Sequence, residues 1–175
     1  DADFVKQLGE EFAAKGNEEN GMLTKGNFTA CLELLETHPA DRDIFDRLFV
    51  LFDRAGDGEI LHADFVIGIA VLVKCSPKQK IKLGLQLQDP ENTGKITKNS
   101  LQRVIGLMSR TSSFFGDKPP TNEALSGIVD RVFNKVVSED PADPTYEIYV
   151  DPIIDHPLLK DFIEQVDDSP RLQHN

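Results

Sequence analysis

The fold is decided by residues 45–74, FDRLFVLFDRAGDGEILHADFVIGIAVLVK. The first part, residues 45–52, carries large apolar side chains at three- and four-residue spacing, as the buried stripe of a helix does. The centre, residues 53–64, is an acidic turn that contains two glycines. The last part, residues 63–73, is apolar almost all the way round, so a helix there is buried on more than one side or offers its second side to a partner. The stretch therefore predicts a helix, a loop and a second helix.

The acidic turn has most of the ligand positions of a calcium-binding loop. Such a loop supplies oxygen ligands from its first, third, fifth and twelfth positions and a backbone carbonyl from the seventh. Asp53, Asp57, Glu59 and Asp64 occupy the first, fifth, seventh and twelfth positions, but the third is Ala55 and the twelfth lacks the longer Glu. We therefore expect calcium or magnesium to bind weakly at these four residues, or no ion at all. In the second case the carboxylates are solvated and backbone hydrogen bonds hold the turn.

A similar loop, DPENTGKITKNS, spans residues 89–100. Its twelfth position is Ser100, whose single hydroxyl replaces two carboxylate oxygens, so we expect even weaker binding. The secondary metal candidates occupy its first, third, fifth and seventh positions: Asp89, Glu91, Thr93 and Lys95.

Two more loops fit the same pattern but have no carboxylate at their first and twelfth positions. With Leu23 as the apolar eighth residue, one loop runs over residues 16–27, and with Ile148 in that place another runs over residues 141–152. The first loop has Gly and Asn at its two end positions, and the second has proline at both. We expect no metal in either.

The spacing of the loops is more informative than any one of them. Loops that begin at Gly16, Asp53 and Asp89 recur after 37 and then 36 residues, each between helical apolar stripes. Self-similarity at a fixed period indicates a repeated supersecondary unit, whereas a single acidic motif has a high false-positive rate. The chain is therefore predicted to consist of repeated helix-loop-helix units.

The remaining helix signals are local. Asp41 is expected to cap the helix before the second loop, and Ser76 to cap the next helix in a capping box with Gln79. Residues 81–88 alternate like a strand, but this start signal favours a helix. Residues 109–121 are polar and rich in turn formers, and we interpret them as a linker. These signals predict an N-terminal unit, 1–75, and a C-terminal unit, 76–175, with this linker and a helical tail.

Composition excludes several classes of function. The 175 residues include 30 acidic and 19 basic ones, and the net charge of −11 repels nucleic acid and anionic lipid, so we expect membrane contact only indirectly. The longest apolar run is shorter than the roughly 20 residues that span a bilayer. Cys31 and Cys75 form no metal-binding or disulfide pattern, which favours a reducing compartment such as the cytoplasm. No catalytic motif is present, so we expect a protein that is not an enzyme.

Residues 48–97, LFVLFDRAGDGEILHADFVIGIAVLVKCSPKQKIKLGLQLQDPENTGKIT, resemble the middle of EF-hand proteins of the calcineurin B, neuronal calcium sensor and calcineurin-B-like group. The resemblance covers nearly all of the chain. It implies an all-α fold of four helix-loop-helix hands paired into two lobes, with short β pairing between loops. It also implies a calcium-sensor-like regulatory or adaptor protein with degenerate loops, which takes an amphipathic helix of a target protein into a hydrophobic groove. By analogy, five apolar residues line the N-terminal half of that groove: Phe45, Phe49, Phe65, Ile69 and Leu72. The alternative for any one of them is that it is an ordinary core residue.

Two other functions stay open. The chain also resembles the regulatory domains of calcium-activated NADPH oxidases, so it could be the sensing domain of a larger enzyme. It also resembles calaxin-type ciliary proteins, so it could be an architectural component of a ciliary or cytoskeletal assembly.

Overall fold

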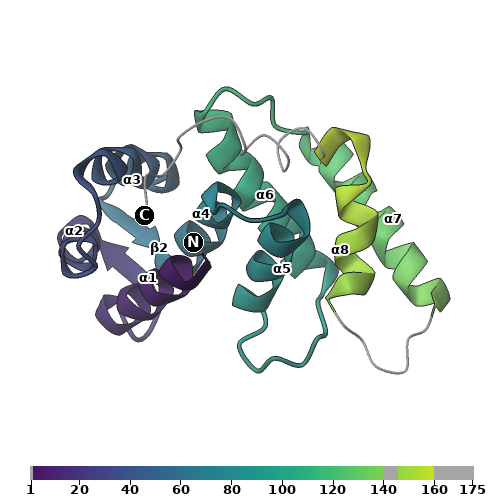
Figure 1. Cartoon of the computed structure of the whole chain (residues 1–175), viewed down its shortest axis with the longest axis horizontal. Coiled ribbons are helices and arrows are strands. Elements are labelled where there is room, and N and C mark those ends of the chain that lie inside the picture. The colour runs from purple at the N-terminus through teal and green to yellow at the C-terminus, as the bar shows by residue number, and fades with distance from the viewer. Residues whose placement is uncertain (1, 140–145, 160–175) are drawn as a thin grey trace.

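The fold is described here from a computed structural model, which describes residues 2–139 and 146–159. In these ranges the chain consists of helices joined by loops and one two-stranded antiparallel sheet (Figure 1). The all-α prediction is confirmed. In chain order the elements are α1 (Ala2–Lys15), β1 (Met22–Thr24), α2 (Lys25–Leu34), α3 (Pro39–Phe52), β2 (Glu59–Leu61), α4 (His62–Ile69), the 3₁₀ turn η1 (Ala70–Leu72), α5 (Pro77–Leu87), α6 (Lys98–Phe114), α7 (Asn122–Glu139) and α8 (Glu147–Ile154).

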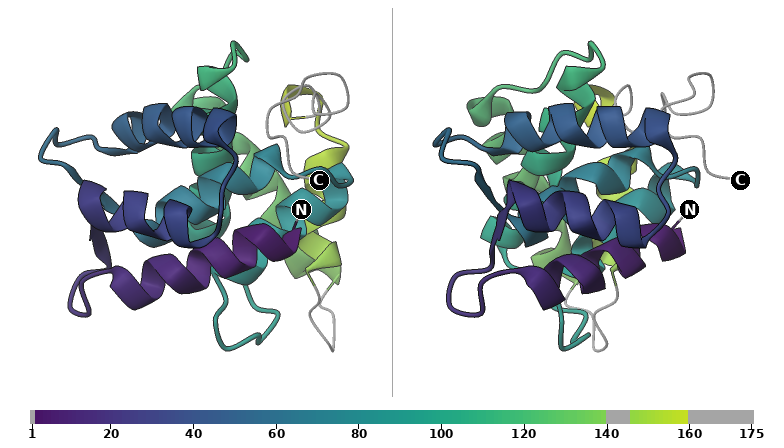
Figure 2. Two further views of the ribbon diagram at one scale, coloured as in Figure 1. Left: turned by 60° about the vertical axis from the view of Figure 1, so that its left-hand side comes forward. Right: turned by 90° about the vertical axis from the view of Figure 1, so that its left-hand side faces the viewer.

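The predicted repeat is visible in where the helices begin. The helices after the first three loops start at Lys25, His62 and Lys98, which is the tenth position of each loop. The first two loops pair through β1 and β2, with Leu23 opposite Ile60. These are the eighth residues of their loops, so the expected β pairing is confirmed for the first pair of hands. Figure 2 shows α1, α2 and α3 stacked along one face of the molecule.

The core runs through both halves of the chain without a break. Helix α4 lies at its centre, in contact with α1 and α3 on one side and with α5 and α6 on the other. The predicted helix over residues 63–73 ends at Ile69 and continues as η1, and all residues from Phe65 to Val73 are buried. Both sides of this apolar segment are therefore covered. Among the described residues, no helix combines the length and the apolar character that crossing a membrane requires.

Gly68 allows α4 to approach its neighbours closely. A Cβ atom at this position would lie 2.3 Å from Cζ of Phe52 and 3.0 Å from Oγ1 of Thr111. Any larger side chain would push α3 or α6 away from α4. The contact between the two halves of the chain is thus fixed by tight packing.

The structure corrects the start of the predicted linker 109–121. Residues 109–114 form the last turns of α6, and only residues 115–121 connect α6 to α7. The polar run continues the helix, and two of its hydroxyls bond back to it: Oγ1 of Thr111 donates to the Leu107 carbonyl at 3.4 Å and Oγ of Ser113 to the Arg110 carbonyl at 2.7 Å. Ser and Thr can therefore lie on a buried helical face here.

Helix α3 begins earlier than expected. Its N-cap is His38, whose Nδ1 accepts a hydrogen bond from the Ala40 backbone at 3.2 Å, and Pro39 is the first helical residue. Asp41 lies buried in the first turn and is not the cap, because proline already has the backbone angle that starts a helix. The capping box of Ser76 and Gln79 is confirmed, and with it the helix over residues 81–87.

The fourth loop differs from the prediction over residues 141–152. Helix α8 starts at Glu147, so Ile148 and Pro152 are helical, and residues 141–145 lie outside the described part. Burial in α8 follows helical spacing, with Tyr149, Val150 and Ile153 buried. Residues 160–175, the end of the predicted helical tail, also lie outside the described part.

Candidate functional site

The second loop is folded around the carboxylate of Asp53. Its Oδ1 accepts from the backbone N–H groups of Gly56 at 2.8 Å and Asp57 at 3.2 Å, and its Oδ2 accepts from Gly58 at 2.9 Å. Gly58, the sixth residue, has a φ of +82°, which favours glycine. Asp57 in turn accepts from the backbone N–H of Glu59 at 3.1 Å. Hydrogen bonds to the loop's own backbone therefore hold this turn.

Asp64, the twelfth residue of the second loop, is bound by the other half of the chain. Its Oδ1 accepts from Nε of Arg103 at 2.7 Å and lies 2.5 Å from Nη2 of the same guanidinium. Arg103 projects from α6, 39 residues further along the chain. The Asp64 side chain is 24% exposed and that of Arg103 44% exposed, so the pair lies at the edge of the contact between the halves.

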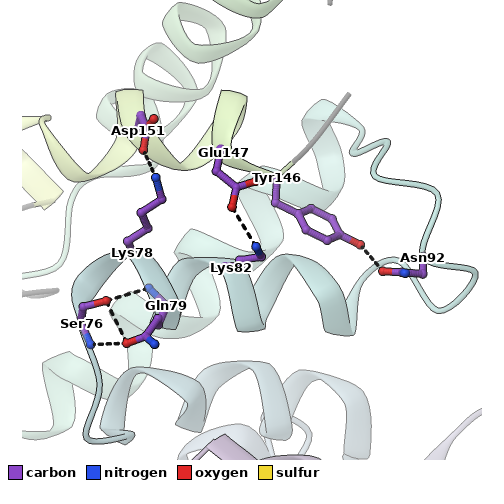
Figure 3. Close-up of polar contacts among 8 residues, drawn as sticks. All are labelled: Ser76, Lys78, Gln79, Lys82, Asn92, Tyr146, Glu147 and Asp151. Carbon is purple, nitrogen blue, oxygen red and sulfur yellow. Dashed lines mark hydrogen bonds and ion pairs between the residues drawn. The ribbon is translucent and has the colours of Figure 1, made fainter. Parts of the chain in front are cut away.

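The third loop is closed by a side chain that the sequence reasoning missed. The hydroxyl of Tyr146 donates to Oδ2 of Asp89 at 2.7 Å. It also lies 3.3 Å from Oδ1 of Asn92 (Figure 3). The same Asp89 oxygen accepts from the Gly94 backbone at 2.8 Å, and Oδ1 accepts from the Thr93 hydroxyl at 3.1 Å. Asp89 and Tyr146 are both buried.

The pKa values of this pair reflect the bond. Burial alone raises the pKa of the Asp89 carboxyl, but the hydrogen bonds from Tyr146, Thr93 and Gly94 outweigh it and lower the pKa below its ordinary value. Burial, and then the bond to Asp89 and its charge, raises the pKa of Tyr146 to about 12. The phenol is therefore a neutral donor to a carboxylate anion at neutral pH.

A second tyrosine hydroxyl is placed where a β partner would be. The backbone N–H of Ile96, the eighth residue of the third loop, lies 3.5 Å from the hydroxyl oxygen of Tyr149, which accepts a long hydrogen bond. In the first pair of hands the equivalent Ile60 pairs with Leu23 in the sheet. Two ion pairs support the position of both tyrosines by joining α5 to α8: Lys78–Asp151 at 2.9 Å and Lys82–Glu147 at 2.8 Å (Figure 3).

The donor sets fit a divalent cation poorly. In the second loop the third position is Ala55, and the twelfth, Asp64, is paired with a guanidinium. In the third loop the first carboxylate already accepts three hydrogen bonds, and Ser100 is bonded to Thr97 at 3.0 Å. Across the residues that the structure describes, no three His, Cys, Asp or Glu side chains gather as a metal ion would require.

The five apolar candidates for partner binding lie together in the core. Phe65 is their centre, with its ring 6.2 Å from that of Phe45 and 5.0 Å from that of Phe28. All five are at most 2% exposed: Phe45, Phe49, Phe65, Ile69 and Leu72. In this structure they are part of the closed core, and Leu72 lies in η1, which contacts α5 and α6 of the other half. A partner could reach these side chains only if helices moved apart.

An open cavity of about 600 Å³ lies between the second loop and helices α6 and α7. Asp57, Glu59 and Asp64 line one wall, and Arg103 and Arg110 another. The Arg110 guanidinium lies over the Phe52 ring, 5.6 Å from its centroid. Burial, and then the positive charge of Arg54, lowers the pKa of Arg110. The cavity therefore brings several guanidinium groups next to the acidic loop.

Comparison with known proteins gives a consistent set of relatives. No protein-family model matches the chain. Calcineurin B of type 2 from Homo sapiens is 29% identical over 109 residues, which are 62% of this chain and 61% of that protein. Calcium-binding protein NCSA of Dictyostelium discoideum is 25% identical over 96 residues, 55% of this chain and 50% of that protein. Guanylyl cyclase inhibitory protein of Lithobates pipiens is 22% identical over 148 residues, which are 83% of this chain and 70% of that protein. The chain thus spans less than two thirds of the length of the first two relatives.

Proposed function

We propose that this chain, an EF-hand protein related to calcineurin B and to calcium sensors, is a regulatory or adaptor module. In this proposal it binds a helix of a protein partner, and calcium binding is weak or lost. The names of two relatives support a protein partner, since one is a subunit of calcineurin and another inhibits a guanylyl cyclase. The relatives are regulatory proteins, which supports a role other than that of an enzyme.

The observation that carries the proposal is the bond between Tyr146 and Asp89. A calcium loop needs an ion because its carboxylates repel one another and their oxygens lack partners. Here the first carboxylate of the third loop receives a phenolic hydroxyl and two further donors from the chain itself. The loop can therefore keep its shape without an ion, and the helices around it do not depend on calcium for their positions.

The partner is expected to be a basic amphipathic helix. The net charge of −11 attracts a cationic segment, and paired hands of this kind bind helices through apolar side chains. We propose that α2 and α3 separate from α1 and α4 to admit the helix beside Phe65 and Ile69. These side chains are buried before binding, so part of the binding energy is spent on opening the hands.

A peptide titration tests this proposal. The probe is a fluorescent synthetic helix of Leu and Lys, and the control is the same peptide with Glu in place of Lys. We expect the basic peptide to bind with the same affinity in calcium and in chelator and to shift the methyl NMR signals of Ile69 and Leu72. The acidic peptide should not bind. Binding that requires calcium, equal binding of both peptides, or unchanged methyl signals would refute the proposal.

We also propose that the protein works in a reducing compartment such as the cytoplasm. Cys31 is buried, Cys75 is half-buried, and both are free thiols. Burial is the main cause that raises the pKa of each thiol, which keeps the reactive thiolate scarce. Quantifying free thiols in protein isolated under alkylating conditions should give two per chain, and a bridged form would contradict the proposal.

A further inference from the structure

We propose that Arg103 serves as a built-in cation for the second loop, so that the contact between the two halves of the chain controls whether a divalent ion can enter. This inference deepens the proposed weak calcium binding and rests on it. The guanidinium holds Oδ1 of Asp64 through two nitrogens, at 2.7 Å and 2.5 Å. The twelfth position is the one from which a calcium loop takes two oxygens of a single carboxylate.

The rest of the loop cannot replace that carboxylate. Asp53 already accepts three backbone hydrogen bonds, and Ala55 has no ligand atom. Asp57 and Glu59 remain, and one oxygen of Asp57 accepts from the backbone of Glu59. An ion that takes both oxygens of Asp64 must therefore draw Oδ1 away from Arg103, and the ion pair opposes this directly.

Further positive charge surrounds the loop. Arg54 belongs to the loop itself, and Arg110 lies two helical turns from Arg103 on the same face of α6, which lines the cavity. The Arg110 guanidinium lies over Phe52, close enough to Arg54 for the two charges to affect one another. Charges of the same sign within this distance disfavour a dication, even though Asp57 and Glu59 attract it. The guanidinium groups thus reduce the potential that the acidic residues create.

Tight packing fixes the position of Arg103. Gly68 of α4 leaves no space for even one more carbon atom between Phe52 and Thr111 of α6. Similarly, a Cβ at Gly84 of α5 would lie 2.6 Å from Cε of Met108 and 2.8 Å from Cγ1 of Val104 on α6. Helix α6 therefore cannot move away from the loop without opening the core. By linkage, an ion that binds the second loop must weaken the contact between the halves, and loosening that contact must favour the ion.

The experiment is a calcium titration followed by NMR, which detects weak binding through the amide signals of Gly56 and Gly58. The proteins are the wild type, Arg103→Gln, Arg103→Lys and Lys98→Gln. Lys98 is a matched control because it lies on the same helix and pairs with Asp130 at 2.8 Å, away from the loop. We expect Arg103→Gln to raise the association constant for calcium about two- to fivefold, which is the upper part of the range for loss of a partly exposed ion pair. Arg103→Lys and Lys98→Gln should stay within about twofold of the wild type.

A second measurement follows the guanidinium itself. In the wild type, calcium at high concentration should shift the Nε–H signal of Arg103 in step with that of Gly58, because the ion displaces the side chain. The inference is overturned if Arg103→Gln binds calcium no better than the wild type, if neither protein binds calcium, or if Arg103 does not respond. Binding of the basic peptide in chelator is measured on the same variants. Its loss in every protein would refute the proposed function and leave this inference intact.

Discussion

Replacing Tyr146 by Phe removes one oxygen atom and should destabilise the protein clearly. The hydroxyl donates to Oδ2 of Asp89 at 2.7 Å, and the side chain is 6% exposed. A hydrogen bond to a charged group is worth about 1.5–3 kcal/mol, so we expect the free energy of unfolding to fall by about 2 kcal/mol. For a chain of this size the corresponding fall in Tm is about 4–8 °C.

Tyr149→Phe is the matched control, because the chain has only two tyrosines and both lie in the same helical turn. The Tyr149 hydroxyl is 3.5 Å from the Ile96 nitrogen, a distance at which the bond contributes little. We expect its removal to change the free energy of unfolding by less than about 0.5 kcal/mol. Urea unfolding in chelator measures both variants. Equal effects of the two substitutions, or no effect of Tyr146→Phe, would show that the hydroxyl does not replace an ion.

The pH dependence gives an independent check of the same bond. The pKa of Tyr146 is raised to about 12, above its unfolded value of about 10. The stability from this bond is therefore complete below pH 10 and is lost as the pH rises towards 12. The Asp89 pKa is lowered, so its part is present above the unfolded value and is lost as the pH falls into the acid range. Absorbance titration of the Tyr149→Phe protein, whose only tyrosine is Tyr146, should show a midpoint near 12, and a midpoint near 10 would refute the bond.

Three more predictions follow from the packing and the charges. Gly68→Ala should lower the free energy of unfolding by about 1–3 kcal/mol, because the new methyl group overpacks the core. Gly127→Ala, on α7 with no atom within 4 Å, should raise it by about 0.5–1 kcal/mol. Urea unfolding measures both changes. Burial lowers the pKa of His62, so stability should fall as the pH drops below about 6.5, and His62→Gln should make the urea midpoint less sensitive to pH in that range. Removal of calcium with a chelator should leave the Tm almost unchanged, and a large drop would contradict the proposed ion-independent fold.

The sequence predicted the structural features that depend on residues close together in the chain. The helix-loop-helix repeat and the capping box of Ser76 are local patterns, and the structure has them where expected. The β pairing between loops that the resemblance implies joins Leu23 and Ile60, the eighth residues of the first two loops. These features could be predicted because a loop of fixed length, with glycine at one position, forces the helices on either side to begin and end at fixed places.

The side chains that bond to the loop carboxylates could not be predicted in this way. Arg103 meets Asp64 across 39 residues, and Tyr146 meets Asp89 across 57. A single Arg on a polar helical face is ordinary, and nothing in its neighbourhood indicates the partner. The two tyrosines, which stand close together in a chain that has no others, were the only available signal. The C-terminal end of α6, residues 109–114, was predicted as linker for a related reason. Most of its Ser and Thr residues are buried against α4 in the structure, but in the sequence they have the composition of a linker.

Tyr146 and Arg103, the two side chains that bond to a loop carboxylate in place of an ion, stabilise different contacts. Tyr146 comes from the hand that pairs with the third loop, so its bond to Asp89 closes the second pair of hands upon itself. Arg103 comes from the opposite half, so its bond to Asp64 joins the two pairs. Loss of the first should loosen one pair of hands and leave the contact with α4 unchanged. Loss of the second should free a carboxylate at the edge of that contact. Of these two loops, the second is therefore the one through which we propose that an ion, or a partner that moves α6, changes the contact between the halves.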